Sequence, residues 1–377
     1  MTLPINAEAF APGDYIREEL EARGWSQLDL AEILGRPPQA VNEIISGKRS
    51  ITPDTAKALG DAFSTSAQLW MNLDSAYQLA KLSEDTDAIS RKARLWELAP
   101  LKEMQKRGWI ERSSSVEILE AQVLEFFEVK TLDEPIQLRH AARKSTDYGE
   151  PTPSQLTWLC RARKLARAVP ITGRFSARSL AKALDELTKL KAEPEEIRHI
   201  PRVLADAGIR LLIVAPLSGS KIDGVTFWLA DDQPVIALSF RFDRIDWFWH
   251  TLMHEIWHVQ QGDGKEAPIL DTDLVGSNAQ PDADKPENER AADAFAVRFL
   301  VDPNELSKFI ARVHPLYSRL KIAAFAKRLM VHPGIVVGQL QHLGKIQYAH
   351  SRDMLVSVRD ILSPGTLTDG WREPIRA

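Results

Sequence analysis

The first 80 residues consist of short apolar segments separated by helix start and stop signals. Within each segment, apolar residues recur three and four positions apart, as on the buried side of a helix. The boundaries are marked by Ser26 and Gly35, by Pro38 and Gly47, by Thr52 with Pro53, and by Ser66. The pattern predicts five helices over residues 14–79. Because helices this short bury little surface alone, they must pack on one another.

The pattern changes at about residue 193, where strands appear between helices. Residues 209–215, 225–229 and 234–240 are β-rich apolar runs, and a turn-like Asp231-Asp232-Gln233 separates the last two. Helices are expected over 243–261 and from Asn288 to about Asp302. We therefore expect an α+β fold, mainly helical, with a small sheet.

Two connecting segments have unbalanced charge. Residues 262–287 hold seven acidic groups against two lysines, which predicts an exposed loop. Residues 139–182 hold ten Lys and Arg against Asp147 and Glu150, a net of +8. The sequence favours a solvated helical face for this basic stretch over a surface that binds phosphates. It assigns no fold to residues 81–191 beyond a helical middle region.

Composition narrows the class of protein. The chain has 377 residues, 44% of them hydrophobic, and a net charge of -4, which is typical of folded globular proteins with more than one domain. Cys160 is the single cysteine, residues 1–14 lack the pattern of an export signal, and residues 329–344 are too short and polar to span a bilayer. We expect a cytoplasmic protein without a membrane partner.

The strongest chemical signal is His254-Glu255-x-x-His258. Two imidazoles four residues apart lie on one face of a helix, where both can bind one zinc ion. Zinc lowers the pKa of water, and Glu255 beside that face can accept the proton. This spacing predicts a zinc-dependent hydrolase, here a peptidase, over the alternative of a helix with two partly buried histidines.

A catalytic zinc needs a third protein ligand. Glu289 is the candidate because it begins the next predicted helix, and Asp293 one turn later can orient a ligating histidine. Glu287, Asp263 and His250 remain alternatives. Apolar residues should press this helix on the first one: Ala292, Phe295, Ala296, Phe299 and Leu300.

These residues resemble the ImmA/IrrE family of zinc metallopeptidases over about 193–345. The resemblance rests on the motif at 254–258 and on Glu-x-x-Ala-Asp-x-Phe-Ala at 289–296. It implies a zincin-like domain with Glu289 as third ligand, Glu255 as general base, and substrate added to the strand at 234–240. The end of the second helix departs from the family pattern, with Leu300-Val301-Asp302-Pro303 in place of Leu-Met-Pro. The candidates for the residue that stabilises the oxyanion are His314, Tyr317 and His332.

Residues 14–79 resemble the lambda-repressor-like helix-turn-helix fold of the XRE family, and more narrowly HigA antitoxins. The resemblance rests on Ser26-Gln27-x-x-Leu30-Ala31, on residues 41–53, and on Leu69-Trp70-Met71-Asn72-Leu73. The helix at 38–46 would then enter the major groove of operator DNA. Gln39, Asn42 and Glu43 are the expected base contacts. The expected contacts near the DNA backbone lie at helix ends and are Gln27, Pro38, Lys48 and Arg49. Residues 1–80 carry a net of -5, so dimerisation or the basic stretch would have to compensate.

The expected domains are a helix-turn-helix domain at 1–80, the helical region at 81–191, a zinc metallopeptidase domain at 192–350 and a tail at 351–377. Two functions fit this organisation. In the first, the chain binds an operator and cleaves a protein partner, a transcriptional regulator. In the second, it is a HigA-like antitoxin and repressor that binds a cognate toxin, with the zinc domain as sensor or scaffold. Intact zinc-binding residues and Glu255 favour the first.

Overall fold

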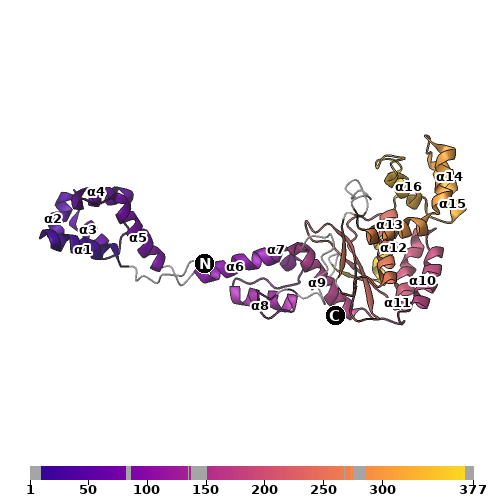
Figure 1. Cartoon of the computed structure of the whole chain (residues 1–377), viewed down its shortest axis with the longest axis horizontal. Coiled ribbons are helices and arrows are strands. Elements are labelled where there is room, and N and C mark those ends of the chain that lie inside the picture. Colours follow the sequence, from indigo (N-terminus) through magenta and orange to yellow (C-terminus); the bar gives the residue numbers. More distant parts are fainter. Residues whose placement is uncertain are drawn as a thin grey trace. The chain divides into compact units, whose positions relative to one another are not determined.

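The computed structural model describes residues 10–81, 86–134, 136, 151–266, 268–272, 274 and 285–369. The chain forms two compact units, Met1–Arg94 and Leu95–Ala377 (Figure 1). The first unit is helical, as the sequence pattern predicts. Its helices are α1 (Pro12–Arg23), α2 (Gln27–Ile33), α3 (Pro38–Ile45), α4 (Pro53–Phe63) and α5 (Ala67–Lys81), and α6 (Thr86–Leu98) crosses into the second unit.

Local side-chain caps set the helix boundaries of the first unit. The Ser26 hydroxyl accepts from the Asp29 backbone N–H, and the Asp29 carboxylate accepts from the Ser26 N–H at 2.7 Å. The Thr52 hydroxyl caps α4 by accepting from the Thr55 backbone N–H. The helices share one core that includes Leu30, Phe63 and Trp70. The short helices are therefore held by mutual packing.

The second unit holds one sheet surrounded by helices. Before the sheet come α7 (Leu101–Lys106), α8 (Val116–Phe127), α9 (Pro153–Ala168), α10 (Ala177–Lys189), η1 (Pro194–His199) and α11 (Ile200–Asp206). The strands are β1 (Arg210–Val214), β2 (Ile222–Trp228), β3 (Pro234–Leu238), β4 (Ile269–Thr272) and β5 (Leu367–Asp369). The remaining elements are α12 (Ile245–Gln261), α13 (Glu287–Leu300), α14 (Pro303–Val313), α15 (Arg319–Leu329), α16 (Pro333–His342), η3 (Arg352–Met354), α17 (Arg359–Leu362) and η4 (Ser363–Gly365).

The strand order is β4-β2-β3-β1-β5. β3 pairs antiparallel with β2 and parallel with β1, while β5 pairs parallel with β1. β5 comes from residues 351–377, the predicted C-terminal tail. The predicted exposed loop at 262–287 contributes β4, which pairs antiparallel with β2. The loop prediction was therefore wrong for these residues, whose pairing partner lies more than 40 positions earlier in the chain.

The position of β3 corrects a second expectation. Substrate addition needs a strand with a free edge. Both edges of Pro234–Leu238 are already paired, one with β2 and one with β1. This strand therefore cannot receive an extended peptide, and the outermost strands among the described residues are β4 and β5.

The basic stretch lies partly outside the described residues. In its described part, cationic side chains of α9 bind carboxylate and carbonyl groups of the same chain. The Arg161 guanidinium pairs with the Asp369 carboxylate at 2.5 Å, Arg167 pairs with Glu128, and the Lys164 ammonium donates to the Glu125 carbonyl at 3.1 Å. These cations therefore attach α9 to β5 and to α8.

The core of the second unit gathers around α12. Trp249, Leu252, Met253 and Ile256 on this helix are fully buried, in one cluster with residues of β1, β3, α13 and α16. α12 ends at Gly262, whose φ of 77° suits glycine at a helix terminus. Within the described ranges, no helix is both long and apolar enough to cross a bilayer.

A close backbone contact in the first unit gives a stability prediction. A Cβ on Gly13 would lie 1.9 Å from the Ile45 carbonyl oxygen, so Gly13→Ala must separate α1 from α3. We expect the free energy of unfolding of that unit to fall by about 1–3 kcal/mol, as at other overpacked sites. Hydrogen exchange of the α1 and α3 amides in the full chain measures it. Ser75→Ala, at an exposed position, is the control; equal exchange in both variants would contradict the contact.

Candidate functional site

The site is built on two packed helices, α12 and α13. α12 places His254 and His258 one turn apart, and both side chains are completely buried. Their Nε2 atoms lie 3.1 Å from each other. Ala292 and Ala296 on α13 are fully buried, and such small side chains let the two helices approach closely. Leu300 is buried as well, and Phe295 and Phe299 pack on the same core.

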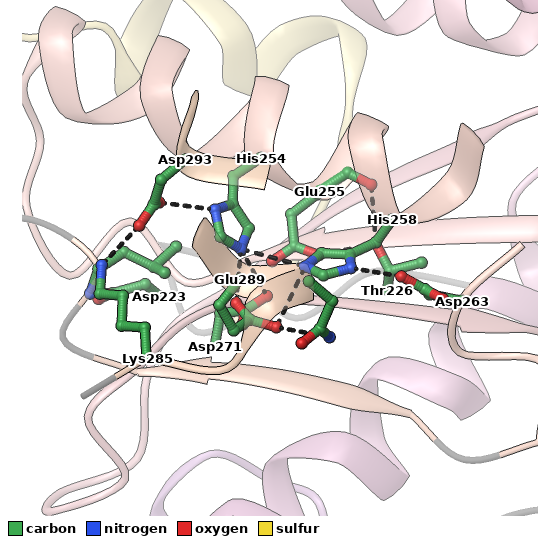
Figure 2. A network of polar contacts seen from close by, with 12 residues as sticks. Asp223, Thr226, His254, Glu255, His258, Asp263, Asp271, Lys285, Glu289 and Asp293 are labelled. Atoms are coloured by element: carbon green, nitrogen blue, oxygen red, sulfur yellow. Dashed lines mark hydrogen bonds and ion pairs between the residues drawn. The ribbon is translucent and has the colours of Figure 1, made fainter. Parts of the chain in front are cut away.

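α13 brings a carboxylate to both imidazoles. Glu289 lies with one oxygen 3.0 Å from His254 Nε2 and the other 3.5 Å from His258 Nε2 (Figure 2). The Asn288 side-chain amide donates to Glu289 Oε1 at 3.2 Å. Glu289 lies in the first turn of α13 and is only 3% exposed, so its charge needs a cationic partner.

The structure adds Asp271, which is not among the candidate ligands predicted from the sequence. Asp271 lies on β4, is 1% exposed, and places Oδ2 3.6 Å from His254 Nε2. Its short strand sits in an acidic, glycine-containing segment, and pairing with a distant strand leaves no local sequence signal. His254, His258, Asp271 and Glu289 each offer a ligand atom, and these atoms all lie within 4.8 Å of one another.

Carboxylates on the far side of each imidazole fix its orientation. His254 Nδ1 lies 2.9 Å from Asp293, and His258 Nδ1 lies 2.9 Å from Asp263. An Nδ1 proton shared with a carboxylate leaves the Nε2 lone pair directed at the centre of the cluster. The Lys285 ammonium contacts Asp293 at 2.5 Å.

The other candidates for a third ligand have different positions. Asp263 contacts the outer nitrogen of His258, and His250 Nε2 lies 3.3 Å from Asp293, also outside the centre. Glu287 is exposed. The candidates for the oxyanion stabiliser make other contacts. His314 Nδ1 is 3.3 Å from the Tyr317 hydroxyl, and His332 caps α16.

Glu255 is completely buried between α12 and β2. Its Oε2 accepts from the Thr226 hydroxyl at 2.7 Å, whereas Oε1 has no hydrogen-bond partner among the described residues. Burial raises the pKa of Glu255 well above its usual range, and the nearby Asp271 charge raises it further. Gly224 leaves room for this carboxyl, because a Cβ there would lie 2.1 Å from Oε1.

The charges of the cluster depend on each other. Burial opposes protonation of His258, but hydrogen bonds to Asp263 and Glu289 outweigh it and raise its pKa to about 10. Burial likewise opposes the charge of Glu289, yet the two imidazoles hold its pKa below its usual range. Burial also raises the pKa of Asp271. His258 is therefore protonated at neutral pH in the absence of a metal, and its Nε2–H can donate to the Nε2 lone pair of His254 at 3.1 Å.

The donor set fits zinc. Two imidazole nitrogens with carboxylate oxygens are common zinc ligands. Asp271 Oδ2 is buried and accepts no hydrogen bond from the described residues, so a cation at the centre would satisfy it. His254, His258 and Glu289 could hold the ion, with Asp271 beside them.

The predicted DNA-contact residues lie at the start of α2, on α3 and directly after α3. Gln27 begins α2, Pro38 begins α3, and Gln39 and Asn42 are exposed on α3. Glu43 is half-buried; it accepts from the Gln39 amide at 3.2 Å and lies 3.7 Å from Arg49. Lys48 and Arg49 are exposed directly after α3.

Comparison with known proteins concerns this first unit. The sequence profile of the helix-turn-helix family matches residues 16–70. Virulence-associated protein I of Dichelobacter nodosus is 40% identical over 83 residues, which are 22% of this chain and 77% of that protein. The uncharacterised HTH-type transcriptional regulator YddM of Escherichia coli K12 is 33% identical over 84 residues, 22% of this chain and 88% of the relative. The structure of Pseudomonas aeruginosa antitoxin HigA with the higBA promoter is 38% identical, covers 22% of this chain and 91% of that chain, and has a TM-score of 0.21.

Zinc binding should release protons. The two Nε2 atoms at 3.1 Å must share a proton in the metal-free chain, and zinc needs both lone pairs. We expect about one proton or more per zinc at pH 7. Affinity should rise with pH until His258 deprotonates near its pKa of about 10.

Calorimetric titration of zinc in buffers of different ionisation enthalpy measures the release. His199 is half-buried and gives the matched control, since the zinc-bound form of His199→Ala should have released the same number of protons as the wild type. An affinity that does not change with pH would contradict the arrangement.

Proposed function

Because the chain belongs, through residues 16–70, to the helix-turn-helix family, we propose that it is a DNA-binding regulator that also hydrolyses peptide bonds in a partner protein. The observation that carries the hydrolase half is the convergence of His254, His258 and Glu289 beside the buried Glu255. The resemblance to ImmA/IrrE metallopeptidases supports the same activity, with a transcriptional regulator as the protein substrate.

His254, His258 and Glu289 would hold one zinc ion. Bound zinc supplies Lewis acidity, which lowers the pKa of water and polarises a carbonyl group. Asp293 and Asp263 keep the two imidazoles in the orientation that binding requires, through contacts of 2.9 Å each. The Lys285 ammonium lies against the second oxygen of Asp293 and balances its negative charge.

Glu255 is the general base of this proposal. Thr226 fixes its Oε2, so the free Oε1 is the oxygen that accepts a proton from the attacking water. The same carboxyl can then return the proton to the leaving amine. Burial, and then the nearby Asp271 charge, raise its pKa, which makes this carboxylate a stronger base than an exposed glutamate.

α3 is the DNA-reading helix of the proposal. Gln39 and Asn42 are exposed on it, and their amides suit adenine edges in the major groove. In the free chain the Gln39 amide donates to Glu43, so it must change partner when it meets a base. Gln27 at the start of α2, together with Lys48 and Arg49, would contact operator phosphates. The chain would bind the operator as a homodimer. The transcriptional-regulator name of the E. coli relative agrees with this role.

An antitoxin-like repressor is the second candidate. In this function the first unit binds an operator and a cognate toxin, while the zinc domain acts as sensor or scaffold. A scaffold does not need a buried carboxyl with an unpaired oxygen next to the cluster, and Glu255 provides one. This observation favours the hydrolase.

Removing the proton acceptor separates the two candidates. Glu255→Gln should still bind zinc, because its side chain is not a ligand, and should slow cleavage by about 10²–10⁴-fold. Comparing proteins that accumulate in native cells with the variant and the wild type identifies the substrate. Glu287→Gln, at an exposed position on α13, is the matched control. A cleavage pattern unchanged by Glu255→Gln would exclude Glu255 as the base.

Base contacts and phosphate contacts should respond differently to mutation. Gln39→Ala combined with Asn42→Ala should relax operator choice, with about 1–3 kcal/mol lost for each base contact. Lys48→Ala should weaken binding to all sequences and reduce the salt slope by about 1. Binding to operator and unrelated DNA over a range of salt measures both effects, with Asn72→Ala as an exposed control. Equal losses on every DNA from the double variant would contradict the groove assignment.

A further inference from the structure

β4 lies beside the part of β2 that contacts the proposed base. Asp271 is opposite Gly224 in the β2–β4 register, and Ile269 is opposite Thr226. The Thr226 hydroxyl donates to Glu255, and a Cβ on Gly224 would overlap the same carboxyl. An extended peptide lying across the metal cluster would pair with this same edge. The chain's own residues 269–272 already fill it.

Asp271 extends from β4 into the metal cluster (Figure 2). Its carboxylate is 1% exposed, and Oδ2 points at His254 Nε2 from 3.6 Å without a hydrogen-bond partner among the described residues. A catalytic zinc has three protein ligands and one position open to water or substrate, whereas a closed zinc site has four. With Asp271 added to His254, His258 and Glu289, the chain supplies four.

A buried contact holds the far end of β4 in place. The Leu274 backbone N–H donates to Asp223 Oδ2 at 2.7 Å, and Leu274 is 5% exposed. Asp223 on β2 also faces the Arg241 guanidinium at 3.1 Å. Strand pairing, this contact and Asp271 thus act together to keep β4 on β2.

We propose that β4 is a built-in inhibitory strand, which occupies the substrate edge of β2 and presents Asp271 as the fourth ligand of the metal. This inference rests on the proposed function and adds its regulation. The closed state excludes water from the fourth position, so hydrolysis requires that β4 be displaced. The displacing partner is an extended segment of a protein that pairs with β2 in its place.

Access of a small metal ligand tests the position of Asp271. Cobalt-loaded full-length protein is titrated with acetohydroxamate and followed by visible absorption. Asp271→Asn keeps the shape of the side chain and removes its charge, so acetohydroxamate should bind about tenfold more tightly, because the apparent Kd falls as the fraction of open sites rises. Asp232→Asn, in an exposed turn, should bind as the wild type does. Equal affinity in wild type and Asp271→Asn would overturn the proposal.

Hydrogen exchange of the wild-type chain gives a test that needs no variant. Zinc should slow exchange of the Ile269–Thr272 amides by anchoring Asp271, with less change in Arg210–Val214 of β1. If zinc binds but leaves β4 exchange unchanged, the inhibitory strand is wrong while the metal site stands. If the wild type binds no zinc, the proposed function itself fails.

Discussion

The second unit depends on the burial of two imidazoles against carboxylates at the contact between α12 and α13. Charged groups at this depth are costly unless each has a partner of opposite charge. Here Glu289 contacts both Nε2 atoms, while Asp293 and Asp263 contact the outer nitrogens. The cluster is therefore stable only with protons or a cation at its centre. This requirement links the packing of the two helices to metal binding.

The elements that carry the cluster differ in how far the sequence predicts them. His254 and His258 are four residues apart on one helix, so their proximity follows from local geometry. Glu289 required the further assumption that the next helix packs on the first, which Ala292 and Ala296 make possible. The capped helices of the first unit are equally local, since Ser26 and Thr52 act within three residues of themselves.

Non-local strand pairing limits prediction from the sequence. Asp271 reaches the cluster because β4 pairs with β2, and nothing in residues 269–272 specifies that partner. The same limit explains the error at β3, whose second neighbour is β1, about 25 residues earlier. A short hydrophobic run indicates a strand but does not indicate which of its edges is free.

X-ray absorption at the zinc edge of the purified full-length chain shows directly whether His254, His258 and Glu289 hold a metal ion. We expect about one zinc per chain, with two imidazole nitrogens and carboxylate oxygens at about 2.0–2.2 Å. Glu289→Gln should lose an oxygen ligand or most of the metal. A chain that purifies without zinc and takes up none when zinc is added would show that these residues do not form a zinc site, as would zinc bound without the two imidazoles.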